Sequence, residues 1–234
     1  LGLSLVMRSR FTRPTQLQYA AARWLLIHFV GDVIAYERTP SADANYTRIH
    51  AAFAEAFERL ASRVPEDTPL VVIAHSLGTV MSSNFFYDLE QARQARARGA
   101  ARLADAPKTP FLRGETLCSL YTLGSPLPLW LLRYPDRPFD RPLHVPALEL
   151  ATHAPAARGE WVNYLDDDDL IAYPLRGLSD AYAHMVSADV TVRLRGRFFS
   201  WQPLVHPYYW TDVRVMRPIG QAVAKLWQSI QNCA

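Results

Sequence analysis

One short apolar run constrains the fold of this 234-residue chain more than any other feature of its sequence. Residues 70–74 read Leu-Val-Val-Ile-Ala, and a His-Ser-Leu-Gly turn follows them directly. A continuous β-branched run of this length is typical of a strand buried on both faces of a parallel sheet. A long helical segment then runs from Leu77 to Ala97 and is closed by Gly99. The pattern predicts a strand–turn–helix unit, which is the building block of a parallel α/β sheet.

Further elements alternate in the same way along the chain. Apolar runs predict three more strands, at 117–123, 161–165 and 190–194. Helical spacing predicts helices near 17–27, over 46–64 with Pro65 as the stop, and over 212–231. This alternation predicts one α/β domain over 1–234, with a mostly parallel sheet and helices on both faces. A proline-rich stretch at about 126–160 is either a surface excursion or a cap over an active site.

Composition excludes several classes of function. Half of the residues are apolar and 20% are charged, as in an ordinary globular domain. The net charge is only +3, and the basic run from Arg93 to Arg102 contains no aromatic residue, so we expect no nucleic-acid partner. No run of about 20 apolar residues exists, so we expect no transmembrane segment and a cytoplasmic protein. The two cysteines, Cys118 and Cys233, favour reduced thiols over a disulfide.

Ser76 lies in the turn between the predicted strand and helix. A serine hydroxyl becomes a nucleophile only when a base takes its proton and nearby donors bind the oxyanion. A tight turn exposes the serine Oγ at the strand end, and the small residues Ala74 and Gly78 let the two backbones approach closely. The N–H of Leu77 is then at a helix N-terminus, where it can bind an oxyanion. In the alternative interpretation Ser76 only caps the helix. In either case we expect the adjacent His75 to be a packed or hydrogen-bonded neighbour.

Partners for such a serine are expected after later strands, in the order acid and then histidine. Four aspartates, Asp166 to Asp169, follow the strand at 161–165, at the sheet edge where ligand sites gather. His206 follows the strand at 190–194, and His184 is its rival. A solvated acidic loop and a packed histidine are the structural alternatives. The histidines have no metal-ligand spacing, so we expect neither a metal nor a cofactor.

Two segments resemble the lipase-like α/β-hydrolases. Residues 161–174 read WVNYLDDDDLIAYP and are similar to the W-x-N-x-x-D-x-x-D-x-[VI]-A-x-P segment of that family. Residues 206–212 read HPYYWTD and are similar to its H-x-x-Y-W-x-D segment. The resemblance implies an α/β-hydrolase fold with Asp169 as the catalytic acid and His206 as the base. It makes Asp166 a structural carboxylate and the reserve candidate for the acid.

The same resemblance implies a serine hydrolase that cleaves carboxylic esters through an acyl-enzyme intermediate. The leucines and the tryptophan of 126–134 favour an acyl ester or lipid-like substrate. Two alternatives stay open, a catalytically silent binding protein of this fold and an acyltransferase with the same triad.

One family element has no counterpart before Ser76. The second oxyanion donor of the family comes from a His-Gly loop after an earlier strand. Two explanations stay open, namely that the chain lacks the first strands of the fold, or that Val30-Gly31-Asp32 takes the place of this loop.

Overall fold

A computed structural model of the chain describes residues 43–99, 107–132, 142–194 and 205–232, together with Arg23, Ile27 and Tyr36. Within these residues four strands form one sheet, in which every neighbouring pair is parallel and the order is β1-β2-β3-β4. The strands are β1 (Leu70–His75), β2 (Leu117–Leu123), β3 (Trp161–Leu165) and β4 (Ala188–Thr191). The α/β class expected from the sequence is therefore confirmed.

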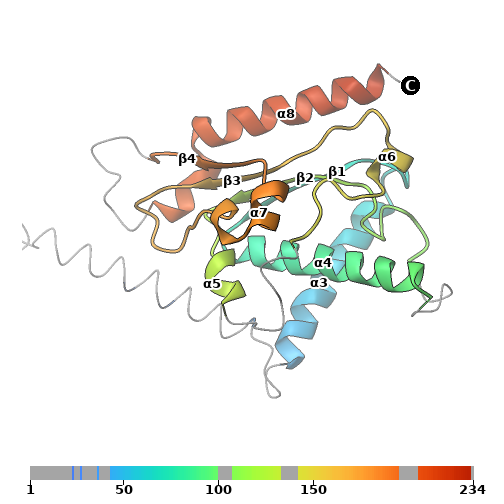
Figure 1. The fold of residues 1–234 in the computed structure, drawn as a ribbon, viewed down its shortest axis with the longest axis horizontal. Helices are drawn as coiled ribbons and strands as arrows, with labels where there is room; N and C mark the ends of the chain where they lie inside the picture. Colours follow the sequence, from blue (N-terminus) through green and yellow to red (C-terminus); the bar gives the residue numbers. More distant parts are fainter. Residues whose placement is uncertain are drawn as a thin grey trace, which may run out of the picture.

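Helices cover both faces of this sheet (Figure 1). The helices are α3 (Asp43–Ala61), α4 (Leu77–Ala97), α5 (Leu127–Leu131), α6 (Leu150–His153), α7 (Asp180–Met185) and α8 (Val213–Gln231). Two short 3-10 helices, η2 (Arg176–Leu178) and η3 (His206–Trp210), complete the described elements. Helix α8 runs along one face, whereas α3 and α4 lie on the other. None of the described helices has the length and apolar character needed to cross a membrane.

Strand β2 is buried at all seven positions, because it carries side chains into both layers. Leu120 packs in a cluster that contains Phe86 of α4. Tyr121 and Leu123 point the other way and pack with Ile219 of α8. This alternation is the period of two that a strand imposes on its side chains. The continuous apolar run thus reflects a strand covered on both faces.

Several element bounds agree with the sequence-based expectations. Helix α4 spans 77–97, β2 spans 117–123 and β3 spans 161–165, as expected. Gly99 has a φ of 74° and donates its N–H to the carbonyl of Arg96, which closes α4. The expected helix near 17–27 lies outside the described residues, except that Arg23 and Ile27 are helical. Val30-Gly31-Asp32 and Cys233 also lie outside them.

Two strand expectations were wrong in detail. The last strand covers 188–191 instead of 190–194, because its pairing with β3 stops where β3 stops, at the Leu165–Thr191 pair. Strand β1 is only half-buried over 71–73, although its composition predicts burial on both faces. It lies at the edge of the sheet that the described strands form, so part of its surface has no neighbouring strand there.

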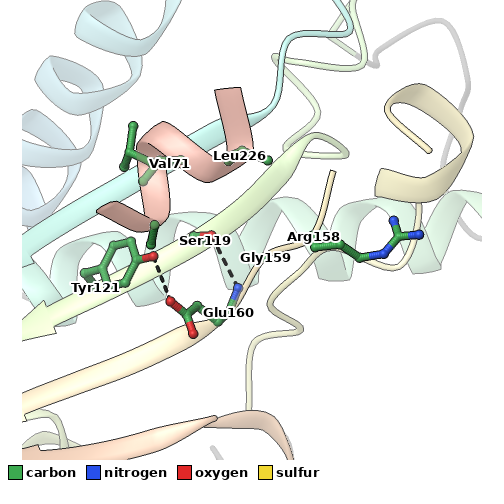
Figure 2. Close-up of a pocket in the computed structure, with 9 residues that line it drawn as sticks. Val71, Ser119, Tyr121, Arg158, Gly159, Glu160 and Leu226 are labelled. Carbon is green, nitrogen blue, oxygen red and sulfur yellow. Dashed lines mark hydrogen bonds between the residues drawn. The ribbon is translucent and has the colours of Figure 1, made fainter. Parts of the chain in front are cut away.

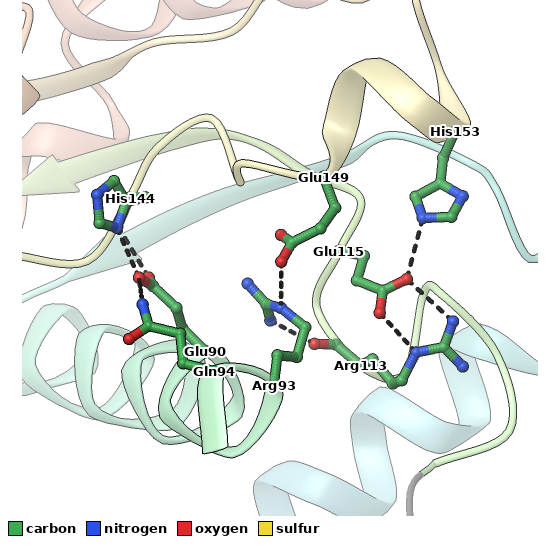
Figure 3. A network of polar contacts seen from close by, with 8 residues as sticks. All are labelled: Glu90, Arg93, Gln94, Arg113, Glu115, His144, Glu149 and His153. Carbon is green, nitrogen blue, oxygen red and sulfur yellow. Dashed lines mark hydrogen bonds and ion pairs between the residues drawn. The ribbon is translucent and has the colours of Figure 1, made fainter. Parts of the chain in front are cut away.

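The second half of the proline-rich stretch is anchored to the body of the domain. Its histidines and Glu149 form a polar network with α4 and with the segment before β2 (Figure 3). The contacts are His144 Nδ1–Glu90 Oε1 at 2.5 Å, Arg93 Nε–Glu149 Oε1 at 3.2 Å and His153 Nε2–Glu115 Oε2 at 2.9 Å. Residues 133–141 lie outside the described residues, so a cap over the site stays a prediction.

Candidate active site

The side chains of Asp169 and His206 meet at the carboxyl edge of the sheet. His206 Nδ1 lies 2.7 Å from Asp169 Oδ2, and the exposed fractions of the two side chains are only 7% and 0%. Because an ionised carboxylate only accepts hydrogen bonds, Nδ1 carries the proton that it shares with Asp169. The other ring nitrogen, Nε2, is buried and has no hydrogen-bond partner among the described residues. An imidazole held at Nδ1 with its Nε2 free has the arrangement of a general base.

Asp169 is held by the loop that leaves β3. Its Oδ1 accepts the N–H of Ile171 at 3.2 Å, and its Oδ2 accepts the hydroxyl of Tyr209 at 3.0 Å in addition to His206. Its own N–H donates to the carbonyl of Asp166 at 3.0 Å. The carboxylate thus has three donors around it, which fix its orientation toward the imidazole.

The four aspartates of this loop divide into two kinds. Asp167 and Asp168 are exposed, whereas Asp166 and Asp169 are buried. The carboxylate of Asp166 accepts the N–H of Leu194 at 2.6 Å and that of Asp168 at 3.0 Å, so it ties two loops together. Burial raises the pKa of Asp166 above its ordinary value. Of the two acid candidates, the structure brings Asp169 to the histidine.

Tyr209 is a member of the site that the sequence analysis did not single out. Its hydroxyl donates to Asp169 Oδ2 and accepts the N–H of Asp166 at 2.9 Å. In a 3-10 helix, side chains three positions apart lie on the same face, so η3 presents Tyr209 and His206 together. Burial, together with the charge of Asp169, raises the pKa of Tyr209 far above its ordinary value, so the phenol keeps its proton. The Tyr of the H-x-x-Y-W-x-D segment was the signal that could have revealed it.

Ser76 forms the turn between β1 and α4. Its φ is 55°, the only positive φ of a non-glycine residue in the described part of the chain. Such a conformation costs about 1–3 kcal/mol and is characteristic of functional sites. Ser76 occupies the N-cap position of α4, but its side chain makes no capping hydrogen bond. Leu77 is the first residue of α4, and its N–H belongs to the helix N-terminus as expected.

Gly124 connects the turn at Ser76 with the Asp169–His206 pair. The N–H of Ser76 donates to the carbonyl of Leu123, the last residue of β2, at 3.0 Å, and Gly124 follows Leu123 directly. A Cβ on Gly124 would lie 3.0 Å from His206 Cε1 and 3.1 Å from Asp169 Oδ2. The imidazole therefore packs directly on the backbone of Gly124, beside the strand end that holds Ser76.

His75 also reaches this cluster, as a packed and hydrogen-bonded neighbour. Its Nε2 lies 2.8 Å from the backbone carbonyl of His206, and the two imidazole rings pack with their centroids 4.6 Å apart. Burial and the nearby His206 lower the pKa of His75 to about 4, so the ring is neutral near pH 7. The rival histidine, His184, is exposed on α7.

A second polar group of residues lies between the sheet and α8, away from His206. A hollow of about 190 Å³ lies between the sheet and α8. Figure 2 shows the residues that line it, among which Tyr121 donates to Glu160 and the N–H of Glu160 donates to Ser119. The residues that line this hollow do not include Ser76, Asp169, His206 or Tyr209. In the described ranges, no three His, Cys, Asp or Glu side chains gather in a way that could hold a metal ion.

Comparison of this chain with protein-family models, with curated proteins and with solved structures finds no match. The geometry of the cluster is therefore the basis for assigning a function.

Proposed function

We propose that this protein is a serine hydrolase of the α/β-hydrolase fold that cleaves carboxylic esters. The observation that carries the proposal is the buried Asp169–His206 pair with its unpartnered Nε2. The pair packs on Gly124, beside the strained turn of Ser76. A nucleophile, a base and an acid that orients the base are the three groups that acyl transfer requires.

Each residue has its own role in the proposed reaction. His206 Nε2 takes the proton of Ser76 as Oγ attacks the ester carbonyl, and the positive charge of the imidazolium is stabilised by Asp169. The N–H of Leu77 binds the oxyanion that forms. When the intermediate collapses, the imidazolium returns the proton to the alcohol that leaves. Water, deprotonated by His206, then attacks the acyl-enzyme, and the proton returns to Ser76 as the acid departs.

Chain order and topology support the hydrolase fold. Ser76 follows β1, Asp169 follows β3 and His206 follows β4, so nucleophile, acid and base lie at one edge of a parallel sheet in the expected order. A second oxyanion donor is part of the proposal, and its candidate, Val30-Gly31-Asp32, lies outside the described residues.

Exposed apolar side chains beside the site favour an acyl ester or lipid-like substrate. Leu170 follows Asp169 directly and is 50% exposed, and Trp210 of η3 is 44% exposed. Apolar walls with few polar groups are typical of sites that bind acyl chains.

The geometry favours catalysis over silent binding. A strained serine and a buried imidazole nitrogen without a partner both lower the stability of the fold, and a binding protein needs neither. Acyl transfer to another acceptor uses the same three residues, so it is distinguished from hydrolysis by its product.

The test uses a fluorophosphonate probe and p-nitrophenyl esters of short and medium chain length. We expect the unaltered protein to be labelled at Ser76 and to release p-nitrophenol, and Ser76→Ala to abolish both while its thermal unfolding stays cooperative. Ser62→Ala is the matched control, because Ser62 is exposed beyond the end of α3. Labelling that persists in Ser76→Ala, or its absence from the unaltered protein, contradicts the proposal.

A further inference from the structure

His75 joins the strand that carries the nucleophile to the loop that carries the base. Its Nε2 is 2.8 Å from the backbone carbonyl of His206, although the two residues are 131 positions apart. A carbonyl oxygen only accepts, so His75 donates its Nε2–H. The rings also pack against each other at a tilt, with centroids 4.6 Å apart and an interplanar angle of 32°. His75 therefore holds both the backbone and the side chain of His206.

The surroundings of His75 fit it for this contact. Val71 and Ile73, on the same face of β1, pack against the cluster that includes α8 and η3, so alternation along the strand points His75 at η3. The rings of Tyr209 and Trp210 lie 5.8 Å and 6.2 Å from its ring. His75 thus packs against the segment that presents the base.

His75 is neutral, which favours protonation of its neighbour His206 during the proposed reaction. The titratable groups that face it are His206, Asp169 and Tyr209. Burial and His206 lower the pKa of His75 to about 4, so it stays neutral while His206 takes up a proton. A second positive ring at this distance would oppose the imidazolium by like-charge repulsion.

We propose that His75 is a positioning residue, which holds His206 so that its Nε2 faces the hydroxyl of Ser76. The proposal deepens the serine-hydrolase function above and rests on it. His75 ends β1 and Ser76 follows it directly, so the group that holds the base is adjacent in the chain to the nucleophile. A misplacement of a catalytic group by about 1 Å costs on the order of 100-fold in rate, which makes such a link valuable.

Two substitutions separate the donor from the ring. His75→Gln keeps an N–H that reaches the carbonyl of His206 but loses the ring that packs against His206. His75→Phe keeps a packed ring and loses the donor. His184→Phe is the control, because His184 is exposed on α7 and the variant shows what a histidine-to-phenylalanine substitution does away from His206.

Ester hydrolysis is the first readout. We expect His75→Phe to lower kcat by about 10- to 100-fold with KM unchanged, because the substrate contacts stay while the base is displaced. His75→Gln should retain most of the kcat of the unaltered protein, and His184→Phe should have the same kcat as the unaltered protein. A kcat that is unchanged in folded His75→Phe overturns the proposal.

A second readout does not depend on turnover. In Ser76→Ala protein, the proton between His206 Nδ1 and Asp169 should give a low-field NMR resonance, which His75→Phe should weaken or remove and His75→Gln should keep. If the unaltered protein has no esterase activity, the hydrolase function fails, whereas this resonance still decides whether His75 holds the pair. If His75→Phe does not fold, His75→Asn replaces it, because its shorter amide does not reach the carbonyl; an unchanged resonance there overturns the proposal.

Discussion

Tyr209 and Asp169 are joined by a hydrogen bond of 3.0 Å from the tyrosine hydroxyl to the carboxylate oxygen that also contacts His206. The same hydroxyl accepts the N–H of Asp166 at 2.9 Å. One phenol therefore connects the carboxylate of Asp169 with the start of the loop that carries it. Since Tyr209 is wholly buried, water cannot take the place of its hydroxyl.

Tyr209→Phe tests this connection. The change leaves the Asp166 N–H buried without an acceptor and removes one donor from Asp169. We expect the free energy of unfolding to fall by about 1–3 kcal/mol and kcat to fall by about 10-fold. Urea denaturation and ester hydrolysis measure the two effects. Tyr121→Phe is the control, because Tyr121 is equally buried but bonds to Glu160; a loss of kcat as large there would contradict a specific role for Tyr209.

The two buried aspartates should respond differently to replacement by asparagine. Asp169→Asn removes the charge that stabilises the imidazolium and favours the wrong tautomer of His206, so we expect kcat to fall by about 10⁴-fold. Asp166→Asn loses one of two acceptors for backbone N–H groups, so we expect mainly a loss of stability, about 1–3 kcal/mol. Steady-state kinetics with urea denaturation separates the effects. A larger kinetic loss in Asp166→Asn would make Asp166 the acid.

Gly124→Ala should disrupt the site more than the fold. Its φ of +57° disfavours any side chain, and the new Cβ would lie 2.8 Å from Tyr209 Cε2 and 3.0 Å from His206 Cε1. Both rings must move, so we expect loss of fluorophosphonate labelling together with a lower melting temperature. Gly78→Ala is the control, because no atom lies within 4 Å of a Cβ at Gly78. The close approach of strand and helix that the sequence predicted at Gly78 was therefore wrong. Normal labelling of Gly124→Ala would show that the pair does not depend on this close contact.

His75 should make the protein sensitive to acid. Its pKa is about 4 in the folded chain against an ordinary 6.5, so the unfolded chain binds the proton more readily. Above pH 6.5, His75 does not lower the free energy of unfolding. As the pH drops from 6.5 toward 4, the free energy of unfolding falls by at most about 3 kcal/mol, because the unfolded chain binds the proton first. His75→Gln should lose less stability than the unaltered protein over this range. Denaturant unfolding at several pH values measures the difference, and parallel curves would contradict the lowered pKa.

Local patterns in the sequence were sufficient for most of the sheet and its long helix. The apolar runs at 117–123 and 161–165 coincide with β2 and β3, and Gly99 marks the end of α4. These signals are local, because a strand buried on both faces needs apolar residues throughout and a helix end needs a residue that tolerates positive φ. The bounds of β4 were not predictable in this way, because they depend on where its partner β3 ends.

Chain order and the resemblance selected Ser76, Asp169 and His206 from the sequence alone. Only the tertiary structure decided which buried aspartate contacts the imidazole, and it added Tyr209, Gly124 and the contact from His75. The physical reason is that these are hydrogen bonds and close packing between residues 37 to 131 positions apart. Such contacts depend on how three strand ends and a 3-10 helix meet, and no local spacing in the chain encodes that arrangement.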